Sequence, residues 1–199
     1  AQPPNQKNNN MEEKEISPQE SLVIIKTMIN KTQRQFNDDS FYYMMWGWLV
    51  FVASIIHFVL IQVEVQQAYY VWFLMPIGGV VSALYGMKAN KKEKIKTHLN
   101  TSMSYLWCAM VVSMMLVIFM GARLNQNTYP ILILIYGIGT FVSGGLLSFR
   151  PLIIGGAICF VLSISSFFVI FEYQLLFIAT AMLVSYIIPG HLLKAKFKN

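Results

Sequence analysis

Apolar residues in this chain gather in long runs that are separated by short polar segments. Between Tyr129 and Phe171 only one charged residue, Arg150, interrupts the apolar pattern. Each flanking run holds about 20 residues, which as an α-helix span roughly 30 Å, the thickness of a bilayer's hydrocarbon core. Pro151 suits the first turn of a helix but not the interior of the preceding one. The stretch therefore predicts a transmembrane hairpin with a tight turn.

Four more runs of this kind predict an all-α membrane protein with six transmembrane helices. The predicted spans are about 41–61, 68–87, 102–120, 129–149, 151–171 and 175–193. Glu172 to Gln174 are expected to form the turn between the last two spans. The composition fits this class, because 56% of residues are hydrophobic and 12% charged, with a mean hydropathy of +0.53.

The segments outside the spans are polar or basic. Residues 1–16 are rich in Asn, Gln and Glu and predict a disordered tail, within which Met11 is the expected natural start. The polar first 40 residues do not resemble a cleavable signal peptide. Residues 194–199 predict a basic cytoplasmic tail.

Residues 17–37 predict an amphipathic helix before the first span. Ser17, Pro18 and Glu20 form a capping box at its start. One face of the helical wheel is apolar and comprises Leu22, Ile24, Ile25, Met28, Ile29 and Phe36. Two placements are open: the helix lies on the membrane surface, or it packs on the protein's own loops. Residues 37–40 are expected to break this helix and to cap the first span.

Small residues recur at every fourth position within several predicted spans. Helices in lipid associate through such positions, because small side chains let two backbones approach closely. The predicted helix-packing residues are Gly78, Ser82, Gly86, Thr140, Gly144, Ser148, Gly155, Cys159 and Ser163. An alternative is that 76–79 and 155–156 break two helices around a substrate site. Phe41, Tyr42, Tyr43, Trp46 and Trp48 predict an aromatic belt at one membrane interface.

Basic residues are distributed unequally between the two sides of the predicted membrane domain. The net charge is +6, and 14 of the 15 Lys and Arg residues fall on the side of the N-terminus, with Arg123 opposite. The positive-inside rule then predicts that both termini are cytoplasmic. Lys88, Lys91, Lys92, Lys94 and Lys96 form the densest basic loop. These lysines either contact anionic lipid headgroups or act only as a topology determinant.

Candidate chemistry within the spans is sparse. His57 is the one histidine in the interior of a predicted span, since His191 lies at the inner interface near the end of the last one. His57 is either a polar binding site or an interfacial side chain bonded to a neighbouring helix. Cys108 and Cys159 lie in apolar runs, which favours packing over a disulfide or metal site. The sequence contains no phosphate-binding loop, zinc-ligand spacing or nucleophile–base pair. It therefore predicts no catalytic residues, no cofactor and no nucleic-acid partner.

Several short motifs resemble those of a family of small six-span bacterial inner-membrane proteins of unknown function. The motifs are Ile16-Ser17-Pro18-Gln19-Glu20-Ser21-Leu22, Met28-Ile29, Trp46-Gly47-Trp48, Gly78-Gly79, Thr97-His98 and Ile188-Pro189-Gly190-His191 with a basic tail. The resemblance covers nearly the whole chain from Met11. It implies the topology but no functional residues.

These patterns favour a non-enzymatic integral inner-membrane protein. The predicted role is a scaffold or regulatory partner that presents a cytoplasmic amphipathic helix and basic loop to a membrane protein or to a second copy of the chain. The alternative is a small carrier or channel for an uncharged or lipidic substrate. A central polar cavity containing His57 would favour transport, whereas a closed bundle would favour the scaffold.

Overall fold

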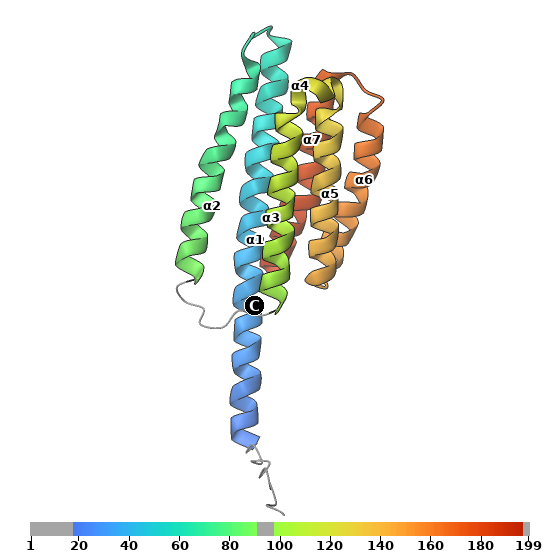
Figure 1. Ribbon diagram of the computed structural model, residues 1–199. Helices are drawn as coiled ribbons and strands as arrows, with labels where there is room; N and C mark the ends of the chain where they lie inside the picture. The colour runs from blue at the N-terminus through green and yellow to red at the C-terminus, as the bar shows by residue number, and fades with distance from the viewer. Residues whose placement is uncertain (1–17, 91–97, 197–199) are drawn as a thin grey trace, which may run out of the picture. The chain divides into compact units, whose positions relative to one another are not determined.

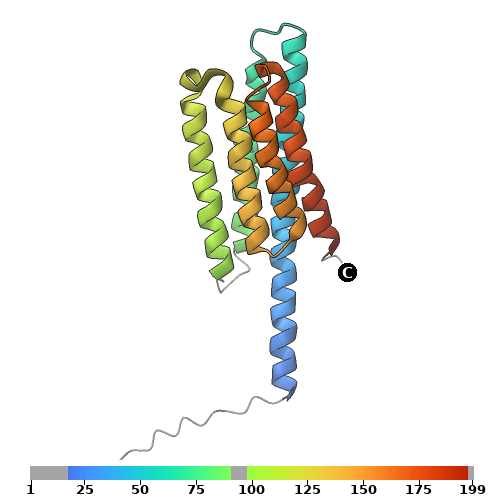
Figure 2. The ribbon, with the colours of Figure 1, turned by 90° about the vertical axis from the view of Figure 1, so that its right-hand side faces the viewer.

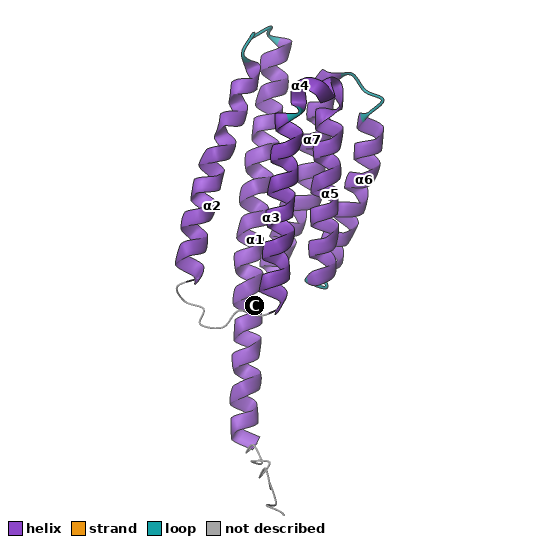
Figure 3. Cartoon of the chain, viewed as in Figure 1, coloured by secondary structure: helices purple, strands orange, loops and turns teal. Residues whose placement is uncertain are grey.

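The computed structural model describes residues 18–90 and 98–196, and every regular element within those ranges is a helix (Figure 3). In the part of helix α1 (Pro18–Gln62) that precedes Ser40, the described side chains are Glu20, Leu22 and Val23. The chain divides into two compact units, residues 1–35 and 36–199. In the first unit Leu22 and Val23 are both exposed on α1.

The second unit is a bundle of helices that run side by side (Figures 1 and 2). After α1 the elements are η1 (Ala68–Phe73), α2 (Leu74–Asn90), α3 (His98–Phe119), α4 (Gly121–Leu124), η2 (Asn125–Asn127), α5 (Thr128–Leu146), α6 (Arg150–Ser166), α7 (Phe171–Met182), η3 (Leu183–Ile187) and α8 (Ile188–Lys196). The connections at 63–67, 120–127 and 167–170 lie at one end of the bundle (Figure 1). The α5–α6 turn and the end of α8 lie at the other (Figure 2).

Five helical stretches are long and apolar enough to cross a membrane. They are Ser40–Gln62, Ala68–Lys88, Thr101–Phe119, Gly121–Leu146 and Phe171–Lys196. The remaining apolar helix, α6, has 17 residues and is shorter than the predicted span at 151–171. The fold is therefore all-helical, with several helices of membrane length.

Helix α1 continues through residues 37–40, so the predicted break at this point is wrong. Asn, Asp and Ser each cost only a few tenths of a kcal/mol relative to alanine inside a helix. Ending one helix and starting another requires a new and unfavourable nucleation step. Ser40 is also buried, which ties this part of α1 into the second unit.

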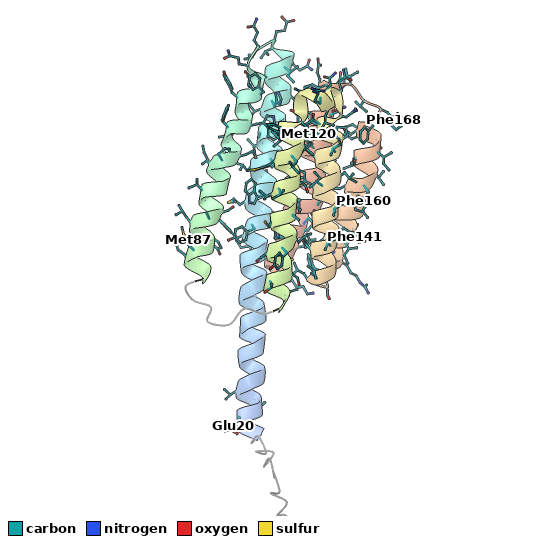
Figure 4. The ribbon with its side chains drawn as sticks, in the orientation of Figure 1. Glu20, Met87, Met120, Phe141, Phe160 and Phe168 are labelled. Atoms are coloured by element: carbon teal, nitrogen blue, oxygen red, sulfur yellow. The ribbon has the colours of Figure 1, made fainter. Side chains whose placement is uncertain are left out.

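The connection between α6 and α7 lies at 167–170 and not at the predicted residues 172–174. Gln174, itself buried on α7, donates from Nε2 to the carbonyl oxygens of Ser166 at 3.2 Å and Val169 at 3.0 Å. The Ser166 carbonyl ends α6 and also accepts the Val169 N–H at 3.3 Å, whereas the Val169 carbonyl belongs to the connection itself. Phe168 points away from the helices at this turn (Figure 4). Gln174 therefore fixes the turn from within the next helix.

The tight turn between α5 and α6 was predicted from Pro151, and Pro151 does lie in the first turn of α6. The N–H of Phe149 donates to the Gly144 carbonyl at 2.9 Å, and that of Ser148 donates to Gly145 at 3.1 Å. These two bonds define a Schellman motif. Ser148 has a φ of 50° and is exposed, so its predicted role as a helix-packing residue is wrong. It is instead the left-handed residue that ends α5.

We expect Ser148→Gly to stabilise the protein. A left-handed backbone costs an L-residue roughly 1–2 kcal/mol, and glycine does not have this penalty. The expected result is a higher melting temperature in detergent. As a control, Ala157→Gly places glycine on the exposed side of the regular helix α6. This variant should lose about 1 kcal/mol of unfolding free energy and should therefore melt at a lower temperature. Equal shifts in both variants would contradict this account of the turn.

The last helical stretch contains a π-helical segment, η3, between α7 and α8. The N–H of Ile188 donates to the carbonyl of Leu183, five residues earlier. Pro189 follows directly and has no N–H to continue the regular ladder. The wider turn therefore accommodates the proline without ending the helix.

The predicted aromatic belt on α1 mostly forms contacts between helices. Phe41 stacks on Tyr85 of α2 with ring centroids 4.1 Å apart. Tyr43 is 1% exposed and packs against Trp107 of α3 and Tyr186 of η3. The belt prediction is therefore wrong for Tyr43, because its ring is buried between Trp107 and Tyr186 and does not face a membrane interface. Trp48 does remain exposed.

Candidate functional site

His57 lies in a small polar cluster near the end of the bundle where α1 meets η1 and α5. The Trp72 indole N–H donates to Nδ1 of His57 at 2.9 Å, and the Tyr129 hydroxyl lies 3.2 Å from the same nitrogen. His57 is 4% exposed and Tyr129 is 7% exposed. His57 and Tyr129 are therefore buried, Trp72 is partly buried, and the three side chains form one group that joins three elements.

The hydrogen bond from Trp72 determines the tautomer of His57. An indole nitrogen can only donate, so Nδ1 must accept and the proton of the neutral ring lies on Nε2. The single lone pair of Nδ1 faces two donor groups, the Trp72 N–H and the Tyr129 O–H. This arrangement requires an uncharged imidazole.

Local structure explains why these side chains meet. Trp72 lies in the 3-10 segment η1, one residue before its end, and η1 leads directly into α2 at Leu74. Tyr129 lies in the first turn of α5, and its ring packs 5.0 Å from that of Phe171, the first residue of α7. The site is thus held at the ends of several helices, while its central residue lies inside α1.

The predicted stripe on α2 faces α1. The indole of Trp46 donates to the hydroxyl of Ser82 at 3.0 Å. A Cβ on Gly78 would collide with Leu49, and one on Gly86 would lie 3.1 Å from the Tyr42 hydroxyl. The small residues of α2 thus make room for large side chains of α1. The neighbouring Gly79 has open space around it.

The predicted small residues of α5 differ in role. A Cβ on Gly144 would lie 2.6 Å from the backbone nitrogen of Ile153 on α6, which is closer than real Cβ atoms approach. Thr140 is fully buried, and its hydroxyl donates to the Tyr136 carbonyl of its own helix at 2.6 Å. Gly144 therefore permits the backbone contact, whereas Thr140 fills space.

The three predicted residues of α6 contact three different elements. A Cβ on Gly155 would lie 2.8 Å from the Cα of Ser185 in η3. Cys159 is fully buried, with Sγ 3.9 Å from the Ala181 carbonyl of α7. Ser163 donates to the Pro130 carbonyl of α5 at 2.8 Å. Neither 76–79 nor 155–156 breaks its helix, since α2 and α6 run through these residues.

Sequence reasoning missed several close contacts. A Cβ on Gly156 would lie 2.6 Å from the backbone nitrogen of Phe141, whose ring packs 5.9 Å from Phe160 (Figure 4). Gly47 of α1 lies against Tyr186, and Gly190 of α8 lies against Met44. These glycines do not belong to the stripes of small residues at every fourth position. The presence of a glycine within an apolar run is the sequence feature that could have indicated these contacts.

The sequence also gave no sign of an aromatic cluster around Tyr186. Tyr186 is 1% exposed, and the ring centroids of Tyr43 and Tyr136 lie 5.5 Å and 5.6 Å from its own. Its hydroxyl has no hydrogen-bond partner among the described residues. Ring separations this short are those of packed aromatic side chains. The cluster is therefore part of the core.

Basic side chains occur at the end of the bundle that holds the α5–α6 turn. Lys88 is exposed in the last turn of α2, while Lys91, Lys92, Lys94 and Lys96 lie outside the described residues. Lys196 lies 5.6 Å from the centroid of the Phe149 ring, next to the exposed Arg150. Two acidic side chains lie at the opposite end of the bundle. Glu64 comes just after the end of α1, and Glu172 lies in the first turn of α7.

No protein-family model, characterised protein or solved structure matches this chain. The class is therefore defined by the fold itself, which is all-helical and has five helices that are long and apolar enough to cross a membrane. This composition and length are compatible with an integral membrane protein.

Proposed function

We propose that this chain is a six-span inner-membrane protein with cytoplasmic termini that acts as a non-enzymatic scaffold or regulatory partner. In this proposal α6 crosses the membrane as the fifth span. Its 17 residues are within the range of known spans, which begins at about 17. The same topology is implied by the resemblance to small six-span bacterial proteins.

The observation that carries the proposal is the close approach of backbones in the core. At Gly144, Gly155 and Gly156 an added Cβ would lie 2.6–2.8 Å from backbone atoms of a neighbouring helix. These contacts leave no space for even a methyl group between α6 and its neighbours α5 and η3. A core closed in this way favours a rigid framework over a substrate path through these helices.

The buried hydroxyl groups support the same interpretation. Ser54, Ser143 and Ser185 each donate to the carbonyl four residues earlier in their own helical stretch, at 2.6–2.7 Å. Hydroxyls bonded in this way are satisfied locally and do not need a polar partner or solute between helices. Among the described residues, none of the buried polar side chains carries a fixed charge. Coupled ion transport usually depends on such charges within the spans.

The proposed orientation rests on the charges at the two ends of the bundle. One end of the bundle holds four basic residues: Lys88 near the end of α2, Arg150 at the start of α6, and Lys194 and Lys196 near the end of α8. Arg123 belongs to a connection at the other end. The positive-inside rule places the first side in the cytoplasm. The amphipathic helix of residues 17–37 and the lysine loop would then both belong to the cytoplasmic side, where anionic headgroups are available.

The scaffold role is tested by recovery of partners from native membranes in mild detergent. We compare the full chain with a double variant, Ile25→Glu with Ile29→Glu, which places charge on the apolar face of the N-terminal helix. A scaffold should recover a membrane-protein partner in stoichiometric amount, and the double variant should lose it. If both proteins purify without a partner and the reconstituted wild-type chain conducts an uncharged solute across vesicles, the carrier alternative is correct.

A further inference from the structure

We propose that His57, Trp72 and Tyr129 form a proton-sensitive latch that holds η1 and the adjoining end of α2 against α1. This inference goes beyond the proposed function and does not depend on it. It rests on the order of donors and acceptors around one imidazole nitrogen. The latch is closed when His57 is neutral and open when His57 is protonated.

The closed state follows from the observed geometry. Nδ1 of His57 accepts the Trp72 indole N–H at 2.9 Å, and this hydrogen bond joins η1 to α1 at this end of the bundle. The indole ring meets the imidazole edge to face, with centroids 6.0 Å apart. Trp72 therefore contributes both a directional bond and a ring contact to the attachment of η1.

Protonation removes the acceptor on which this bond depends. A proton from solvent adds to Nδ1, the nitrogen that holds the lone pair, and both ring nitrogens then donate. Two N–H groups at 2.9 Å cannot form a hydrogen bond with each other. The Tyr129 oxygen, 3.2 Å from Nδ1, has lone pairs and is able to accept the new proton. His57 thereby changes partner from Trp72 to Tyr129.

Nearby ionisable groups do not compensate the new positive charge. From α5, the titratable group that faces His57 is Tyr129 itself. From α7, the Glu172 carboxylate accepts a bond from Gln62 at 3.2 Å, and Tyr173 packs against Phe58. Glu64 lies in the turn after α1, and Tyr69 and Tyr70 of η1 contact each other. Among the described residues, none forms an ion pair with His57.

The rest of α2 remains attached when the latch opens. Ser82 accepts the Trp46 indole N–H, and Tyr85 stacks on Phe41, both toward the opposite end of the helix. Release of Trp72 therefore frees one end of the η1–α2 stretch while the other end stays on α1. The expected motion is a local opening of η1.

The latch is tested by the indole N–H signals of the full chain in detergent, recorded by ¹⁵N–¹H NMR between about pH 8 and about pH 5, where histidine titrates. The Trp72 signal is assigned by its loss in Trp72→Phe. We expect it to lose its hydrogen-bonded chemical shift as the pH falls. The Trp46 signal, bonded to Ser82, is the internal control and should not move.

The matched variant is His57→Gln, because its amide oxygen can accept the Trp72 N–H at every pH. We expect its Trp72 signal to be independent of pH. A Trp72 signal that is unchanged across the range in the wild-type chain would overturn the proposal. The same holds if Trp46 moves together with Trp72, or if His57→Gln responds to pH as the wild type does.

Discussion

Gly144→Ala should lower the melting temperature in detergent, whereas Gly145→Ala, one residue further along α5, should raise it. The added Cβ at position 144 would lie 2.6 Å from the Ile153 nitrogen and 2.9 Å from the Leu152 Cβ. Because a backbone atom cannot move aside as a flexible side chain can, α5 and α6 must separate. Overpacking of this kind typically costs about 1–3 kcal/mol, and occasionally more.

The control works in the opposite direction because Gly145 has no atom within 4 Å of its Cβ position. Alanine is favoured over glycine in a helix by up to about 1 kcal/mol, so this variant should gain stability. The two substitutions make the same chemical change on neighbouring residues. If both raise the melting temperature, α5 and α6 do not meet closely at Gly144, and the closed core that supports the scaffold role is lost.

The positions of the helices were largely predictable because apolar run length is a strong signal in lipid. The boundaries were not, and each error has a physical cause. Residues 37–40 favour a helix end by local propensity, but the continuing helix and the burial of Ser40 outweigh it. The end of α6 depends on Gln174, which acts from the following helix and cannot be recognised from residues 151–171 alone.

The candidate site was only half predictable for a similar reason. His57 stands out as a histidine within an apolar run, but its partners lie 15 and 72 residues away along the chain. Spacing within one helix identified Gly144 and Gly155, because small residues at every fourth position lie on the same face of a helix. It misassigned Ser148, which has already left the helix, and it missed Gly156, whose partner is a backbone atom of α5.

With 17 residues, α6 is the shortest of the six proposed spans. Alkaline phosphatase is active only where its disulfides form, outside the cytoplasm. If α6 crosses the membrane, the chain alternates sides at every connection, so fusions after Asn125 and after Phe168 should be active. A fusion after Asn199 should then be inactive, because the sixth span returns the chain to the cytoplasm.

Phosphatase activity at these three sites reports directly whether α6 crosses the membrane. We predict an on/off difference between the fusions at Asn125 and Phe168, which report the outer side, and the fusion at Asn199, which reports the inner side. If α6 does not cross, the Phe168 fusion becomes inactive and the Asn199 fusion becomes active. That result, or inactivity at Asn125, would contradict a six-span protein with cytoplasmic termini.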